Sequence, residues 1–177
     1  MNSHGYHGTS IRDIAVEAGV SSAALYHHFD TKQAILVAIM RRALDDSADA
    51  TKAAAAAAGP QPDRQLAAVV QAWVGFHAER RADALIGASE IRSLEAGPRA
   101  EIIELRDRQE RFFRSIIEAG LSDGSFAVSR ADHATRAIIT MGTSVATWFD
   151  ASDRDTPEQI AREYADLVLA MVGTRKD

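Results

Sequence analysis

The chain has 177 residues, 46% of them apolar and 25% charged, which is typical of one globular domain or of one domain with a small extra module. It contains no cysteine, so disulfide frameworks, thiolate metal sites and thiol nucleophiles are excluded. No apolar run approaches the ~20 residues that cross a bilayer, and residues 1–9 are too polar for a signal peptide. We therefore expect a soluble cytoplasmic protein with no membrane partner.

The charges are distributed unevenly along the chain. Twenty Lys and Arg face 25 Asp and Glu, a net charge of −5, which argues against a protein wholly devoted to nucleic acid. Residues 1–45 hold equal numbers of basic and acidic side chains and four of the six histidines, so residues 46–177 carry the whole acidic excess. Any nucleic-acid surface is expected in the first quarter.

Helices are favoured along the whole sequence. Only four prolines occur, and none interrupts a stretch with helical apolar spacing. Sustained apolar-polar alternation is absent, and so is a repeat of about 20 to 50 residues. The predicted fold class is all-α.

Three helices are predicted before the first proline, over residues 10–18, 22–29 and 32–58. Thr9 or Ser10 caps the first, Gly19 ends it, and Ser21 caps the second. The third runs into an alanine tract that could instead be a low-complexity linker. Alanine is the best helix former, so one long helix ending at Gly59 is favoured.

Further helices are predicted around residues 66–77 and over 82–95, 98–120, 129–151 and 157–172. Gly97 and Gly120 are expected to end the second and third of these, with a loop over residues 121–128. Thr156 is expected to cap the last helix, with Pro157 in its first turn.

The most informative segment is residues 9–32, two short helices joined by a tight turn at residues 19–21. Leu25 and Phe29 lie four residues apart and are expected to face inward together. The opposite face of the second helix has small and polar side chains and can enter a major groove. Tyr26, His28 and Lys32 are donors suited to phosphate oxygens, and the first helix begins at Thr9 or Ser10, where an N-terminus favours anions.

This segment, TSIRDIA-EAGVS-AALYHHF-TK, resembles the helix-turn-helix of the TetR family of bacterial transcriptional repressors, with Gly19, Leu25, Tyr26, Phe29 and Lys32 in register. The resemblance implies an N-terminal helix-turn-helix DNA-binding domain over residues 1–46. It also implies a helical effector-binding and dimerisation domain over residues 47–177. Such a protein represses transcription and releases operator DNA on binding a small-molecule effector.

The resemblance also assigns DNA contacts by position. Ser22, Ala23 and Ala24 would approach base edges, and Tyr26, His28 and Lys32 would hold phosphates. The full expected DNA-binding set is Ser10, Arg12, Ser22, Ala23, Ala24, Tyr26, His27, His28 and Lys32.

One departure from the family concerns the N-terminus. Family members carry a further helix before the turn at Gly5, and this chain has only four residues there, so the DNA-binding domain is expected to be incomplete. A misplaced start is favoured over a true truncation. The alternative function is a dimeric small-molecule sensor of the same fold that has lost effective DNA binding.

Other chemistry has little support in the sequence. His27 and His28 point ~100° apart on a helix and have no third ligand at a suitable spacing, so no metal site and no cofactor are expected. No segment resembles a nucleophile elbow or a phosphate loop, so the chain is not expected to be an enzyme.

An effector pocket is expected among large side chains of the C-terminal part, although each of them could simply be core. The candidate residues are Trp73, Phe76, His77, Arg92, Phe112, Phe113, Met141 and Trp148, with Arg106 as a second cation. The Trp148-Phe149 ending followed by TPEQI resembles a TetR subgroup that regulates fatty-acid and sterol breakdown, which implies a lipid or acyl-CoA effector.

The final two helices are expected to form a homodimer. Their apolar residues are Ala134, Ile138, Met141, Gly142 and Val145 in one and Ile160, Tyr164, Leu167 and Met171 in the other. Two such helices from each subunit would make a symmetric four-helix interface, or these faces could be covered within one chain. Reading a palindrome requires two motifs about 34 Å apart, which favours the dimer.

Overall fold

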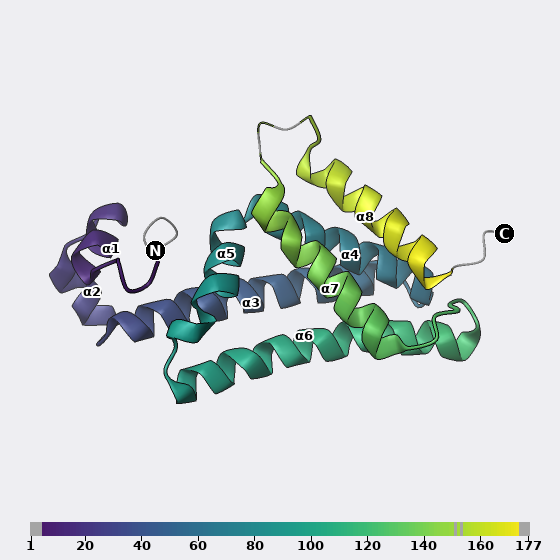
Figure 1. The fold of residues 1–177 in the computed structure, drawn as a ribbon, viewed down its shortest axis with the longest axis horizontal. Coiled ribbons are helices and arrows are strands. Elements are labelled where there is room, and N and C mark those ends of the chain that lie inside the picture. Colours follow the sequence, from purple (N-terminus) through teal and green to yellow (C-terminus); the bar gives the residue numbers. More distant parts are fainter. Residues whose placement is uncertain (1–4, 151, 153, 174–177) are drawn as a thin grey trace.

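The structure is a computed structural model that describes residues 5–150, 152 and 154–173. The described part is helical and contains no strand. Its elements are α1 (Ile11–Glu17), α2 (Ser22–His28), α3 (Lys32–Ala57), α4 (Pro62–Glu79), α5 (Arg81–Glu90), the 3₁₀ turn η1 (Ile91–Ser93), α6 (Ala96–Asp123), α7 (Ala131–Trp148) and α8 (Pro157–Val172). Figure 1 shows α1 and α2 as a small head at one end, joined by α3 to a body that contains α4 to α8.

Local capping explains the two helices of the head. The Ser10 hydroxyl accepts a hydrogen bond from Asp13 N (3.2 Å), and the Asp13 carboxylate accepts one from Ser10 N (2.8 Å). Gly19 has a φ of +67°, the left-handed conformation that ends a helix, and Ser21 caps α2 through Ala24 N. Both helices therefore form within one residue of their predicted bounds.

The long helix α3 is continuous through the alanine tract. Thr31 caps it by accepting from Ala34 N (3.0 Å), and Gly59, with a φ of +83°, follows its end. The prediction of one helix rather than a linker is confirmed. With 26 residues at 1.5 Å each, α3 extends for about 39 Å from the head into the body.

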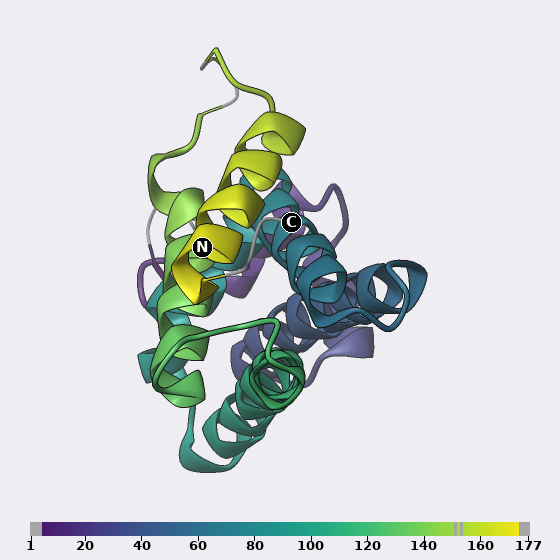
Figure 2. The same cartoon turned by 90° about the vertical axis from the view of Figure 1, so that its right-hand side faces the viewer.

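Helix α4 is the centre of the body. It packs against α3, α5, α6, α7 and α8. Figure 2 shows the body from the right-hand side of Figure 1, with α8 (yellow) beside α7 (green). The face predicted from apolar spacing is buried: Leu66, Val69, Val70, Trp73 and His77 are at most 6% exposed. The four apolar ones join residues of α6, α7 and α8 in the main hydrophobic core.

Three predicted boundaries were wrong. Helix α5 ends at Glu90 rather than at residue 95, because η1 follows it and the Gln33 side chain bonds the backbone at Ser93 and Glu95. Gly120 does not end α6, which continues to Asp123 and stops at Gly124 (φ +81°). Gly120 is instead a close-approach glycine, since a Cβ there would overlap the Phe126 ring.

The third boundary is that of α7, which spans Ala131–Trp148 rather than residues 129–151. Phe149 is its C-cap, with extended backbone, and Ala151 lies outside the described residues. Helix α8 begins as predicted, with Thr156 and Gln159 forming a capping box and Pro157 in the first turn.

A second hydrophobic cluster lies where the head meets the body. It contains Tyr6 from the N-terminal turn, Leu36 and Met40 from α3, and Ile86, Leu94 and Ile102 from the α5–α6 region. The start of α3 is therefore packed against the segment that joins α5 to α6. Among the described residues, no helix is both long and apolar enough to cross a membrane.

Candidate DNA-reading face and effector cavity

Helix α2 presents an exposed face built from small and polar side chains. Ala23, Ala24, His27 and His28 are exposed, Ser22 is half-buried, and Tyr26 is 55% exposed. On the opposite side, Leu25 and Phe29 are half-buried. The α2 face therefore has the exposure and the small N-terminal residues that major-groove entry needs.

The preceding helix adds two predicted contacts, Ser10 and Arg12, and both are exposed. The Ser10 hydroxyl is already engaged, because it donates to Asp13 Oδ2 (2.7 Å) and accepts from the Asp13 backbone. Arg12 is the more available donor of the two for a phosphate or a base.

Lys32 has a structural role that sequence reasoning missed. Its Nζ donates to the carbonyl oxygens of Tyr6 and Thr9, both at 2.9 Å, and lies 4.0 Å above the Tyr6 ring centroid. Two of the three ammonium protons therefore tie the N-terminal turn to the start of α3, and one is left for a phosphate.

The head has little core of its own. Ala15 is the one buried residue of α1, and α2 has none. Val16 is 74% exposed and Val20 is 45% exposed. An apolar side of the head thus faces outward in the described part of the chain.

His27 and His28 lie next to each other in the last turn of α2. The His27 and His28 rings lie edge to face, with centroids 5.2 Å apart. Across the described residues, no group of three His, Cys, Asp or Glu side chains is placed to hold a metal ion.

A cavity of about 560 Å³ lies in the body between α3, α4, α5, α6 and α7. Its size is that of a pocket for a small molecule. It is lined by Met40, Ala43, Leu44, Ser47, Trp73, Phe76, His77, Asp83, Ala84, Gly87, Ala88, Ile102, Ile103, Arg106, Asp107, Gln109, Glu110, Ile139 and Thr143. Most of its exposed lining is apolar.

Three of the eight predicted effector residues, Trp73, Phe76 and His77, line this cavity. All three project from α4, and Phe76 and His77 rings lie edge to face at 5.6 Å. Three of the predicted residues thus lie together at one cavity, and the binding of an effector there stays a prediction.

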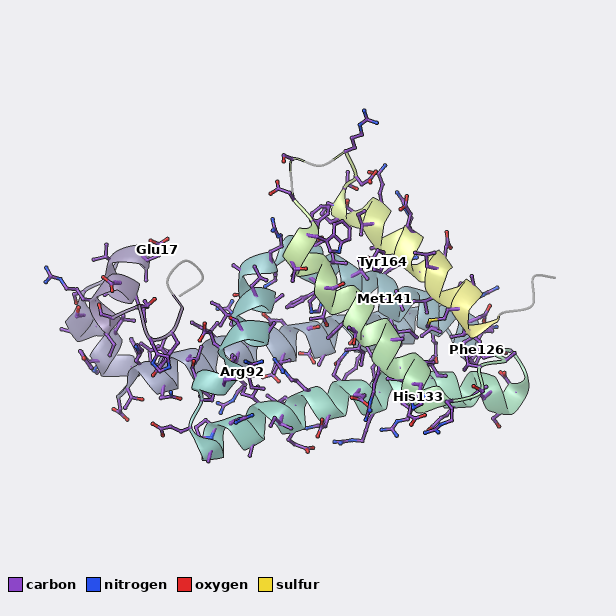
Figure 3. All side chains as sticks on the ribbon, in the orientation of Figure 1. Glu17, Arg92, Phe126, His133, Met141 and Tyr164 are labelled. Carbon is purple, nitrogen blue, oxygen red and sulfur yellow. The ribbon has the colours of Figure 1, made fainter. Side chains whose placement is uncertain are left out.

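The other five predicted effector residues do not line the cavity. Phe113 is fully buried and packs edge-on against Trp73 (5.5 Å), and Phe112 is half-buried beside it. Trp148 is 47% exposed and stacks on Tyr164. Arg92 is exposed in η1 and Met141 is half-buried on α7, as labelled in Figure 3. Helical spacing identified large side chains but not which way each one points.

Two buried polar groups give the cavity its electrostatic character. His77 Nδ1 donates to the Trp73 carbonyl (2.7 Å), and burial lowers the pKa of His77, so the ring is neutral and Nε2 is an acceptor. Arg106 donates to the Gly87 carbonyl (2.5 Å), and burial lowers the pKa of its guanidinium. Of the two cations that the sequence suggested for the pocket, Arg106 lines the cavity and Arg92 does not.

The start of α3 is connected to the segment between α5 and α6 and to α6 itself. Gln33 Nε2 on α3 donates to the Ser93 carbonyl (2.6 Å), and Glu95 N donates back to Gln33 Oε1 (3.4 Å). An ion pair between Arg41 and Glu101 (2.6 Å) joins α3 to α6 nearby. The start of α3 is therefore held to the last residue of η1 and to the N-cap of α6.

Comparisons with known proteins agree with this division into head and body. Residues 1–39 match the family described as bacterial regulatory proteins, tetR family, and residues 59–172 match the tetracyclin repressor-like, C-terminal domain. The chain is 29% identical over 167 residues to the HTH-type transcriptional repressor KstR2 of Rhodococcus jostii, covering 93% of this chain and 81% of that protein.

Solved structures show the same fold. A tetR-family regulatory protein from Rhodococcus RHA1 superposes with a TM-score of 0.88 at 34% identity, covering 97% of this chain and 90% of that one. AibR in complex with isovaleryl coenzyme A and operator DNA has a TM-score of 0.80 at 23% identity, covering 96% and 89%. The chain therefore belongs to the TetR family of DNA-binding transcriptional repressors, which are not enzymes.

Proposed function

We propose that this protein represses transcription as an operator-bound homodimer and releases the operator when a small molecule occupies the cavity beside α4. The observation that carries the proposal is that α3 forms part of the cavity wall and also begins at the reading head. A ligand that changes the position of α3 thereby changes the position of α2.

The DNA contacts follow from exposure and chemistry. Ser22, Ala23 and Ala24 at the start of α2 approach base edges in the major groove. The donors Tyr26, His27 and His28 hold backbone phosphates, together with Arg12 from α1 and the third proton of Lys32. Ser10 joins them when its hydroxyl exchanges Asp13 for the DNA. Residues 1–46 act as the reading unit and residues 47–177 as the effector and dimerisation unit, with α3 shared between them.

The proposed dimer uses the outer faces of α7 and α8. The large apolar side chains left exposed there are Trp148 (47%), Leu167 (59%) and Met171 (39%), with Tyr164 and Met141 half-buried beside them (Figure 3). Ala134, Ile138, Gly142, Val145 and Ile160 are buried within the chain itself and contribute to its core instead. The interface therefore rests on fewer residues than apolar spacing alone indicates.

A lipid or acyl-CoA is the proposed effector class. The apolar lining of the cavity supports it, and AibR, a protein of the same fold, is described with isovaleryl coenzyme A and operator DNA. At 23% identity that likeness shows the fold alone, so the lining is the stronger support.

The test is a salt titration of the full chain against its own upstream intergenic DNA and against a scrambled duplex. Preferential binding that weakens steeply with salt supports an operator-reading dimer. Equal, weak binding to both duplexes by a folded dimer would contradict it. That second result would support a ligand sensor without effective DNA binding, for which the exposed Val16 and Val20 are the structural argument.

A further inference from the structure

We propose that Arg106 and Ser47 form a polar subsite inside the effector cavity and that the effector is an amphipathic acid, an apolar body with one carboxylate head. This inference rests on the proposed effector cavity and adds to it the chemistry of the ligand.

Arg106 is a cation without an anionic partner. It lines the cavity from α6, is half-buried, and uses one donor on the Gly87 carbonyl of α5. Desolvation alone shifts its pKa, downward, so no nearby carboxylate compensates for its burial in the described part of the chain. A planar guanidinium with free donors matches a carboxylate, which it can bind through two parallel hydrogen bonds.

Ser47 supplies a second unsatisfied group in the same cavity. Its side chain lies on α3, is 3% exposed, and its Oγ has no hydrogen-bond partner among the described residues. Buried hydroxyl groups are nearly always hydrogen-bonded, so an orphan hydroxyl on a residue that lines a cavity points to a ligand atom, which the Oγ reaches by rotation about the Cα–Cβ bond because it is shielded in the present rotamer. Other polar groups here are satisfied: Gln109, for example, donates to Thr51 Oγ1 (2.9 Å).

The carboxylates that line the cavity do not neutralise Arg106. Asp83 is paired with Arg80 (2.6 Å), and Glu110 is paired with Arg136 (3.6 Å). Asp107 is exposed to solvent on α6. The interior thus presents one uncompensated positive charge.

The remaining lining explains the apolar body of the ligand. Met40, Leu44, Phe76, Ile102 and Ile103 supply hydrocarbon and aromatic surface around the cavity. A neutral lipid would leave Arg106 unpaired, and a polyanion would exceed the single cation that the interior offers. A monocarboxylic acid satisfies both the charge and the apolar surface.

The experiment is isothermal titration calorimetry of the full-length dimer with octanoate, 1-octanol and octanoyl-CoA, which share one apolar chain. We expect octanoate to bind about tenfold or more tightly than 1-octanol, because a charge-assisted hydrogen bond adds to the same apolar contacts. Arg106→Gln should remove that preference and leave the Kd of 1-octanol within about twofold, and Arg106→Lys should retain part of it. Ser47→Ala should raise the octanoate Kd about threefold.

Arg108→Gln is the matched control, since Arg108 is on the same helix but exposed and paired with Glu104, and it should bind octanoate as the unmodified chain does. Equal affinities for octanoate and 1-octanol would overturn the acid subsite while leaving the cavity as an effector site. Tighter binding of octanoyl-CoA that still depends on Arg106 would overturn the free acid in favour of a conjugate. If none of the three bound, the effector cavity itself would fail, a result separate from the salt titration on DNA.

Discussion

Gln33, the second residue of α3, donates to the Ser93 carbonyl at 2.6 Å and accepts from the Glu95 amide, so one side chain joins the start of α3 to the segment between α5 and α6. Gln33→Ala removes both bonds, and we expect a loss of roughly 1 to 2 kcal/mol in the free energy of unfolding. Hydrogen exchange should rise together in residues 31–40 and 91–98. Gln71→Ala, at an exposed position of α4, is the control. Faster exchange in only one of the two segments would show that they are not coupled through Gln33.

Lys32→Ala tests whether Lys32 contacts a DNA phosphate or only stabilises the N-terminal turn. Losing two charge-assisted bonds to Tyr6 and Thr9 should cost about 2 kcal/mol of stability and weaken binding to all DNA sequences alike. If the third proton holds a phosphate, the salt slope of binding should also fall by about one. An unchanged salt slope in a folded variant would mean that Lys32 serves only to hold the N-terminal turn.

Tyr26→Phe should weaken binding to all DNA sequences without loss of stability, because Tyr26 is 55% exposed.

Ser22 is the position expected to affect sequence preference. It opens α2 at the point where the helix would meet base edges, so Ser22→Ala should change the ratio of affinities for operator and scrambled duplex by severalfold. Competition binding measures this ratio directly. Ser89→Ala, exposed on α5, should leave it unchanged. If Ser22→Ala lowered the affinity for both duplexes equally, Ser22 would contact the sugar-phosphate backbone of the DNA rather than base edges.

Gly142 allows α7 to approach Trp73 closely. A Cβ there would overlap the indole, whose Nε1 donates to the Ile139 carbonyl (3.3 Å), so Gly142→Ala should cost about 1 to 3 kcal/mol. Gly75→Ala is the matched control in α4, because a Cβ there meets nothing within 4 Å. It should stabilise the protein by roughly 0.5 to 1 kcal/mol. In chemical denaturation, the midpoints of the two variants should therefore shift in opposite directions from that of the unmodified protein.

The lowered pKa of His77 predicts that the protein loses stability in mild acid. Burial lowers the pKa of His77 in the folded state below its ordinary value of 6.5, so the unfolded chain binds the proton first as pH falls. Its contribution is complete above pH 6.5 and is lost as pH falls from there toward the folded pKa. The carboxylate of Asp132, with a pKa lowered to about 2, stays ionised throughout this window, and its contribution to stability is lost only at lower pH.

The measurement is the denaturation midpoint between pH 7.5 and 5.5. His77→Gln should flatten the decline, while His133→Gln, at an exposed histidine, should not. An equally steep decline in the His77 variant would attribute the effect to other groups.

The head was predictable because its signals are local. Ser10, Gly19 and Ser21 determine where α1 and α2 begin and end, and each acts within four residues of its own position. The cavity was only partly predictable, since a lining residue is defined by helix rotation and by neighbours far away in sequence. Phe76 and Phe113 look alike in sequence, yet one lines the cavity and the other is core.

Small residues were the other difficulty for prediction. Glycine commonly ends a helix, so the sequence predicted a helix end at Gly120. Only the structure shows that Gly120 lies inside α6, where the Phe126 ring leaves no room for a Cβ. Small residues of α5 also line the cavity, namely Ala84, Gly87 and Ala88. Because they have little or no side chain, they add no large apolar residue to the helical spacing from which the pocket was predicted.

The unbroken course of α3 through the alanine tract turns a small displacement into a large one. A rod about 39 Å long that pivots by 5° at its far end moves its near end by about 3 Å. Lys32, at that near end, holds the N-terminal turn through Tyr6 and Thr9, and α2 is joined to α3 by residues 29–31, so both move with it. In a dimer with two-fold symmetry, the α2 helices of the two subunits would move by equal distances. The spacing between them would then change by up to twice the displacement of one helix. A ligand that tilts α3 by a few degrees can therefore mismatch two half-sites without unfolding any part of the head.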